Sequence, residues 1–284
     1  MKFGFFGINM NVCSNPEVAA RVAQAAEAAG FESVWTGEHV VLPDPQAAPS
    51  PLPPLHPLLD PAVALAFIAA HTKKVRLGTG IIILPQRNPL VLAKELASVD
   101  VVSGGRLIFG LGIGYLKAEF DALGAPFGQK GPRSMEYLQA MKAVWTQENP
   151  SYQGQFVSFS AIQARPQPVQ KPHPPVVIGG HTKEAFQRAV EHGNGWYGFA
   201  LDVAATAKCL AGLKEAAQKV RRPAELGTLE ISITPGPALD LDLDLAKRYA
   251  DLGVSRLIPF RRAKTEQELL DFISQSSSTL IGKV

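Results

Sequence analysis

The chain has 284 residues, 46% of them hydrophobic, and a formal net charge of +3 from 28 basic and 25 acidic side chains. This length and apolar content exclude a disordered chain, and the interspersed charges offer no basic run for nucleic acid or a membrane surface. Cys13 and Cys209 are too few for a disulfide framework. With no signal-peptide pattern and no continuous apolar run of about 18 residues, we expect a cytoplasmic protein.

Short apolar runs alternate with longer helical patterns, which is typical of parallel strands buried on both faces. We expect eight strands, at Lys2–Ile8, Ser33–His39, Val75–Leu84, Arg106–Leu111, Val176–Gly179, Gly195–Phe199, Leu229–Thr234 and Arg256–Phe260. We expect the helices that follow them at Pro16–Ala29, Pro61–His71, Pro89–Val102, Thr182–His192, Val203–Lys219, Leu241–Leu252 and from Thr265 onward. Proline at a helix start and glycine at its end support these bounds.

Eight strand–helix pairs in a chain of this length predict an α/β fold, a (β/α)8 TIM barrel that forms one domain over residues 1–284. An insertion follows the fourth strand, with a helix near Pro132–Thr146 and a β-prone stretch at Phe156–Phe159. A doubly wound sheet is the alternative. It is disfavoured because the turn after the first strand reads GINMNVCSNP and lacks the G-x-G-x-x-G fingerprint.

Two loops are rich in proline. The segment Pro43–Pro61 holds eight prolines in nineteen residues, and Arg165–Pro175 reads RPQPVQKPHPP. The first loop follows a strand end, on the face where barrel active sites are built. We interpret it as a substrate-side wall or lid, with a stiff surface connection as the alternative.

Glu38 and His39 end the second predicted strand. An imidazole titrates near neutral pH and can exchange a proton during a reaction, so His39 is a candidate catalytic residue. The alternative is a histidine whose ring is satisfied by a neighbouring carbonyl, with Glu38 closing an internal salt bridge.

Glycines are notable in three further strands. Gly80 lies within the third strand, and Gly112 and Gly114 alternate along the fourth, where they leave room for a flat ligand or for a neighbouring strand. The fifth strand ends in Gly179 and Gly180, and Thr182 is then a plausible N-cap. A helix start of this kind is an anion site, or else a plain tight turn.

Other chemistries find little support. The six histidines are scattered without metal-ligand spacing, and no G-x-S-x-G nucleophile elbow is present. We therefore expect no bound metal and disfavour a metal-dependent barrel hydrolase.

Together these segments resemble the luciferase-like monooxygenase superfamily, most closely its coenzyme F420-associated branch. The resemblance covers nearly the whole chain and is carried, in order, by MKFGFFGI, AAEAAGFESVWTGEHVVLP, VRLGTGIIILPQRNPLVLAKELASVDVVSGGRLIFGLGIGYLKAEFDALG, GPRSMEYLQAMKAVW and PPVVIGGHTKEAFQRAVEHGNGW.

The resemblance implies a flavin-type cofactor at the carboxyl ends of the strands. It places a non-proline cis peptide at Gly80–Ile81 behind the ring and Glu38 with His39 beside it. The other implied cofactor contacts are Gly112, Gly114, Tyr115, Gly179, Gly180, His181 and Thr182, of which the last four hold the phosphate arm. Tyr115 stands where sugar-phosphate dehydrogenases of this branch carry an acid, and Pro43 where they carry tryptophan, which disfavours that activity.

We therefore expect an oxidoreductase that transfers a hydride between F420 and a small organic substrate. In this hypothesis His39 exchanges the proton with the substrate, while Glu38 orients His39 and tunes the pKa of the imidazole. One alternative is an FMN-dependent two-component monooxygenase that uses O₂ and reduced FMN from a separate reductase. A flavin-binding protein without catalysis is another. Relatives often form homodimers, so we expect one here, without nucleic-acid or membrane partners.

Overall fold

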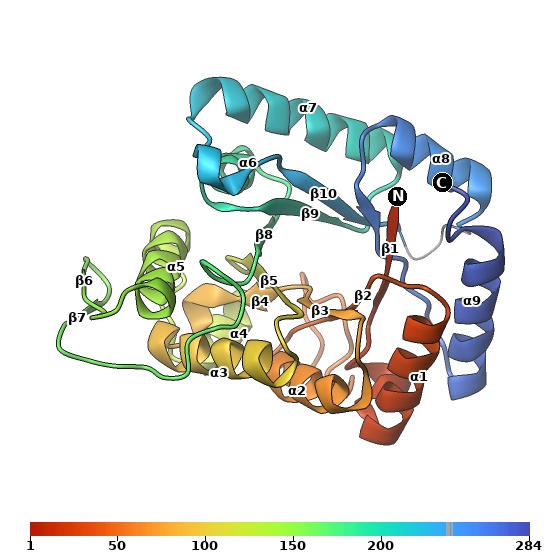
Figure 1. The fold of residues 1–284 in the computed structure, drawn as a ribbon, viewed down its shortest axis with the longest axis horizontal. Helices are drawn as coiled ribbons and strands as arrows, with labels where there is room; N and C mark the ends of the chain where they lie inside the picture. Colours follow the sequence, from red (N-terminus) through yellow and green to blue (C-terminus); the bar gives the residue numbers. More distant parts are fainter. Residues whose placement is uncertain (237–238, 240) are drawn as a thin grey trace.

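Eight parallel strands close into a barrel in the computed structural model, which describes residues 1–236, 239 and 241–284 (Figure 1). The ring consists of β1 (Lys2–Phe6), β2 (Ser33–Thr36), β3 (Arg76–Thr79), β5 (Leu107–Gly112), β8 (Val176–Gly179), β9 (Gly195–Phe199), β10 (Glu230–Thr234) and β11 (Arg256–Leu257). Neighbours pair in parallel around this order, and the β3–β5 and β1–β11 pairings close it. The predicted TIM barrel is confirmed, with several strands shorter than expected.

Helices cover the outside of the ring (Figure 1). They are α1 (Pro16–Ala28), α2 (Pro61–His71), α3 (Pro89–Val102), α6 (Lys183–His192), α7 (Val203–Lys219), α8 (Leu243–Asp251) and α9 (Glu266–Thr279). Asn15, Asp60 and Asn88 each precede a proline and accept hydrogen bonds from the first backbone N–H groups of their helices. This pairing of cap and proline explains why the sequence located these helix starts so well.

The third barrel strand is interrupted, which corrects the continuous strand expected over Val75–Leu84. After β3 comes the cis peptide Gly80–Ile81, and the chain then resumes as β4 (Ile82–Ile83). Gly78 pairs with Ile108 and Ile82 with Leu111, so this strand carries one residue more than β5 does. The extra residue makes a bulge. The hydroxyl of Thr79 bridges it, donating to the Gly110 carbonyl and accepting from the Gly110 N–H, both at 2.8 Å.

The insertion between β5 and β8 contains more structure than the sequence predicted. It starts with a short helix, α4 (Lys117–Ala122), which was not expected. The helix α5 (Lys130–Thr146) begins two residues before the predicted Pro132, and the hairpin of β6 (Tyr152–Gln153) and β7 (Ser158–Phe159) follows. Figure 1 shows this hairpin beyond α5, away from the ring.

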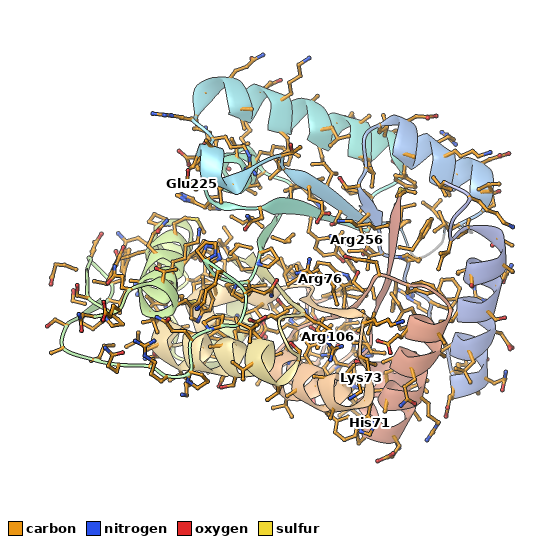
Figure 2. All side chains as sticks on the ribbon, viewed as in Figure 1. His71, Lys73, Arg76, Arg106, Glu225 and Arg256 are labelled. Carbon is orange, nitrogen blue, oxygen red and sulfur yellow. The ribbon has the colours of Figure 1, made fainter. Side chains whose placement is uncertain are left out.

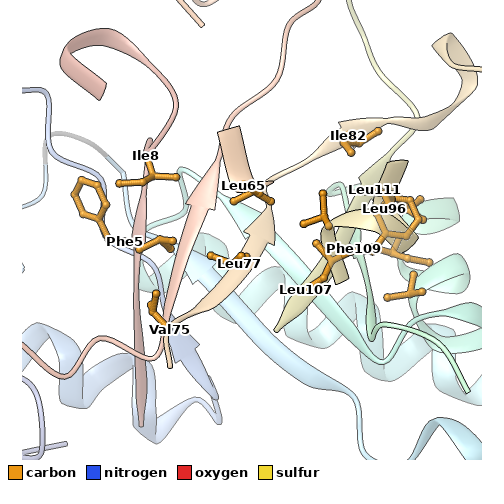
Figure 3. Packing of buried hydrophobic residues seen from close by; sticks show 14 of the residues in the cluster. Phe5, Ile8, Leu65, Val75, Leu77, Ile82, Leu96, Leu107, Phe109 and Leu111 are labelled. Atoms are coloured by element: carbon orange, nitrogen blue, oxygen red, sulfur yellow. The ribbon is translucent and has the colours of Figure 1, made fainter. Parts of the chain in front are cut away.

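Two apolar clusters and one buried cation stabilise the barrel. The larger cluster lies between strands and helices, as the packing of Leu65, Leu77 and Leu96 illustrates (Figure 3). The smaller one includes Phe6, Met10, Trp35, Ile108, Val177, Tyr197 and Ile258. At the amino end of the strands Arg256 is fully buried and bonded to Glu32 and Glu230, and Figure 2 shows it among the strands. Within the described ranges, no helix has the length and apolarity needed to cross a membrane.

Candidate functional site

A hydrogen-bonded cluster gathers at the carboxyl ends of β2 and β5. His39 follows β2, Tyr115 follows β5, and Glu119 comes from α4. Oε2 of Glu119 lies 3.2 Å from Nδ1 of His39, and the Tyr115 hydroxyl lies 3.5 Å from its Nε2. A carboxylate only accepts hydrogen bonds, so Nδ1 carries the proton and Nε2 presents a lone pair when the ring is neutral.

Glu119 is a buried carboxylate with several donors around it. Its Oε1 accepts from the Val40 N–H at 2.6 Å, and its side chain is 1% exposed. Burial raises the pKa of Glu119, but the hydrogen bond and charge of His39 and the bond from the Val40 N–H outweigh burial, so the net shift is downward. The group therefore stays ionised and holds His39 in one orientation. Glu119 was not among the site residues predicted from the sequence, although the sequence places this acid four residues after Tyr115.

Glu38 does not orient His39, which corrects the role expected for it. Its carboxylate accepts hydrogen bonds from the Ile83 N–H and from both Nε and Nη2 of Arg87. Arg87 also donates to Asp60 at 2.9 Å. Glu38 and His39 therefore contact different partners, Glu38 through Ile83 and Arg87 and His39 through Glu119. Glu38 instead joins the end of β2 to the strand that follows the bulge.

The glycines of β5 and β8 make room for Ile81. A Cβ added at Gly112 or Gly179 would collide with Cδ1 of Ile81, and one added at Gly110 would meet its Cγ2 at 3.0 Å. Gly114, at φ +74°, leaves room for Ile83 and for the ring of Phe120. The sequence suggested that these glycines leave room either for a flat ligand or for a neighbouring strand. The structure shows that a side chain, not a ligand, fills the space beside them. Ile81 is partly exposed and lies across β5 and β8 as an apolar platform.

The segment from Gly179 to Thr182 joins the end of β8 to the start of α6. Gly180 has φ +122°, and Thr182 caps the helix by accepting from the Ala185 N–H at 3.2 Å. Nε2 of His181 accepts from the Phe199 N–H at 3.2 Å, so the proton of the neutral ring sits on Nδ1. The exposed Glu184 carboxylate uses this helix end: its own backbone N–H and the Thr182 hydroxyl lower its pKa. An incoming anion would have to displace it.

Arginines on α5 and α6 lack ionic partners. Among the described residues, neither Arg133 nor Arg188 makes an ion pair, and the Nε atoms of both are buried without a hydrogen-bond acceptor. The Arg133 guanidinium lies 4.2 Å from the centroid of Phe156. Lys130, one turn earlier, donates to the Gly114 carbonyl at 2.8 Å. Buried guanidinium donors without acceptors favour an anionic ligand, and the sequence analysis did not identify them.

The first proline-rich loop is anchored at the barrel mouth by Asn9. This buried side chain donates to the carbonyls of Gly37 and Leu59, at 2.9 and 2.6 Å, and accepts from the Gly37 N–H at 2.8 Å. The loop carries His56, whose Nε2 is buried and has no partner among the described residues. Burial lowers the pKa of His56, and the charge of His39 lowers it further.

Among the residues that the structure describes, no group of three or more His, Cys, Asp or Glu side chains is arranged to hold a metal ion.

Known proteins resemble the chain over most of its length. The family described as luciferase-like monooxygenase matches residues 1–276. An uncharacterized protein of Mycobacterium tuberculosis is 33% identical over 250 residues, covering 84% of this chain and 85% of that protein. The oxygenase component of flavin-dependent trigonelline monooxygenase from Acinetobacter baylyi is 32% identical over 174 residues, covering 61% of this chain and 45% of that protein.

Solved structures share the fold at low identity. Monooxygenase RslO1 from Streptomyces bottropensis matches with a TM-score of 0.79 and 22% identity over 99% of both chains. The coenzyme F420-dependent tetrahydromethanopterin reductase from Methanopyrus kandleri matches with a TM-score of 0.78 and 17% identity, over 99% of this chain and 98% of that chain. The expected resemblance is confirmed by the family match over residues 1–276, and the chain belongs to the luciferase-like monooxygenase family.

Proposed function

We propose that this oxidoreductase transfers a hydride between coenzyme F420 and a small organic substrate. The observation that carries the proposal is His39, fixed by a buried carboxylate at the barrel mouth with Nε2 available for proton exchange. Hydride transfer to or from an oxygen- or carbon-centred group needs a proton partner, and an imidazole near neutral pH serves well.

The residues present fit a flavin-type cofactor. The apolar Ile81 platform, which follows Gly80, suits one face of a flat ring. Gly180, His181 and Thr182, together with the arginines of α5 and α6, suit its anionic arm. When bound, F420 supplies two-electron hydride chemistry, and the protein supplies position and proton handling.

The choice of F420 over FMN rests on the cationic side chains of α5 and α6. The side chain of F420 carries a phosphodiester and additional carboxylates, whereas FMN ends in a single phosphate. Lys130, Arg133 and Arg188 place three cations on the α5–α6 side, and the buried Nε atoms of both arginines lack acceptors among the described residues. A single phosphate does not require three cationic donors, so these side chains favour the more anionic cofactor, F420.

A second candidate is an FMN-dependent monooxygenase that receives reduced FMN from a separate reductase and reacts with O₂. It is favoured by the Acinetobacter baylyi relative, which is itself an oxygenase component. The same platform and proton-handling cluster would serve it. A third candidate, a flavin-binding protein without catalysis, would bind cofactor without any dependence of turnover on His39.

We also propose that the protein forms a homodimer through α2 and α3. The helix α2 contains no Asp, Glu, Lys or Arg, yet Val63 on it is 66% exposed. On α3, Val91 is 55% and Val102 60% exposed. An apolar helix surface of this kind suits a self-association interface. Light scattering should give twice the monomer mass, falling to the monomer mass for Val63→Asp, and a monomeric wild-type protein would contradict the proposal.

The experiment that separates the cofactors is a fluorescence titration of the purified protein with F420 and, separately, with FMN. Tight F420 binding with weak FMN binding is expected, and the reverse would favour the two-component monooxygenase. Arg133→Met should weaken binding of the tighter cofactor, whereas Arg221→Met, at an exposed position just after α7, should not. Equal effects of the two variants would contradict the arm assignment.

A further inference from the structure

Tyr115 lies beside His39 and is the more exposed of the two. Its hydroxyl faces Nε2 of His39 at 3.5 Å, and the two rings are nearly perpendicular, at 88°. The side chain of His39 is 10% exposed, whereas Tyr115 is 49% exposed. The phenol is therefore more accessible to a substrate from solvent than the imidazole is.

The direction of the hydrogen bond follows from Glu119. Because the carboxylate accepts from Nδ1–H, Nε2 of the neutral ring is an acceptor, and the Tyr115 hydroxyl is the donor. A separation of 3.5 Å is at the outer limit for such a bond. Catalytic hydrogen bonds are often this long before a ligand is bound and shorten in the complex.

We propose that the Tyr115 hydroxyl exchanges the proton with the substrate and that His39 takes this proton from Tyr115 or returns it. The inference rests on the proposed function and replaces the cofactor contact expected for Tyr115. In the oxidation of an alcohol, the substrate O–H proton passes to Oη of Tyr115 while the proton of Tyr115 passes to Nε2 of His39. The carbinol C–H bond breaks, its electron pair leaves as the hydride that oxidised F420 accepts, and a C=O bond forms. Reduction runs in reverse.

The groups around the phenol suit this role. Burial raises the pKa of Tyr115, and the charge of Glu119 raises it further, so the phenol stays protonated at neutral pH and can donate. The titratable groups near His39 are Glu119 from α4, Tyr115 after β5 and His56 from the proline-rich loop. The carboxylate of Glu119 compensates the positive charge that His39 gains when it accepts the proton.

The test compares Tyr115→Phe with Tyr152→Phe, a tyrosine in the β6–β7 hairpin outside the site. Nitrogen-15 NMR of the histidine rings reports the hydrogen bond at Nε2 of His39 without any cofactor or substrate. We expect Tyr115→Phe alone to shift this resonance. With F420 and a panel of secondary alcohols, Tyr115→Phe should lower turnover by about 100-fold, the scale of general acid–base catalysis, at unchanged F420 affinity.

An unchanged Nε2 resonance, or wild-type turnover in Tyr115→Phe, would overturn the role of Tyr115. A wild-type protein that binds F420 but turns over no alcohol would instead contradict the proposed substrate chemistry. In that case the NMR comparison still decides whether Tyr115 is bonded to His39, so the two failures are distinguishable.

Discussion

Replacing Glu119 by glutamine tests the electrostatic centre of the site while preserving its shape. In the wild-type protein, Oε1 accepts from Val40 and Oε2 accepts from Nδ1–H of His39. A glutamine has one acceptor and one donor, so its oxygen can keep the Val40 contact while its NH₂ faces His39. Two donors would then oppose each other unless His39 moves its proton to Nε2. Glu119→Gln should therefore switch the tautomer of His39.

The expected magnitude follows from the type of bond that is lost. A hydrogen bond to a charged group contributes about 1.5–3 kcal/mol. Glu119 stabilises the imidazolium form of His39 more than the neutral form. Where turnover requires the orientation of His39 that this bond fixes, its loss should lower turnover by about 10- to 100-fold, at 1.36 kcal/mol for each factor of ten.

Nitrogen-15 NMR of the histidine rings distinguishes the two tautomers of His39. Glu136→Gln is the matched control, since Glu136 is also a carboxylate that accepts backbone hydrogen bonds, from Phe156 and Val157, but in the hairpin region. A His39 tautomer in Glu119→Gln that is the same as in the wild type would refute this prediction. Equal changes in both variants would indicate a general structural effect instead.

Two further predictions concern stability. A Cβ at Gly110 would collide with the Thr79 carbonyl, so Gly110→Ala should lower the free energy of unfolding by about 1–3 kcal/mol or more in denaturant titrations, whereas Gly128→Ala, with open space around it, should not. Burial raises the pKa of Glu32, but its bonds to Arg256 outweigh burial and the net shift is downward. Glu32 therefore stabilises the fold above its unfolded pKa of about 4.3 and loses this contribution as pH falls through its lower folded value. Glu32→Gln should therefore reduce the loss of stability as the pH falls into the acidic range. An unchanged pH dependence of stability would contradict the assignment.

Most of the fold could be predicted because the local signals agree with the tertiary structure. Proline at the first helical position, preceded by Asn or Asp, marked helix starts such as those of α2 and α3, whose bounds match the prediction. Within the third strand, by contrast, the apolar run after Gly80 gave no indication of a break. The bulge depends on its pairing with β5, which is a non-local property.

The site was only partly predictable, for reasons of distance and direction. His39 stood at a predicted strand end, where barrel active sites are built, so its position alone made it a candidate. Its partner Glu119 lies 80 residues away on a short helix that no periodicity revealed. The role expected of Glu38 was wrong because its carboxylate is bonded to Ile83 and Arg87, contacts that adjacency to His39 in the sequence did not indicate. From the sequence, Arg133 and Arg188 resembled ordinary helix-surface cations. Only the structure shows that the Nε atoms of both are buried without an acceptor among the described residues.

The central claim is that His39 handles the proton of an F420-dependent hydride transfer. The most direct test measures F420 binding by fluorescence and turnover by the deazaflavin absorbance, in the wild-type protein and in His39→Ala, with a panel of secondary alcohols and activated alkenes. The account predicts equal F420 affinity in both proteins and turnover in the wild type that falls by about 100-fold or more in the variant. Equal turnover in the two proteins would contradict it.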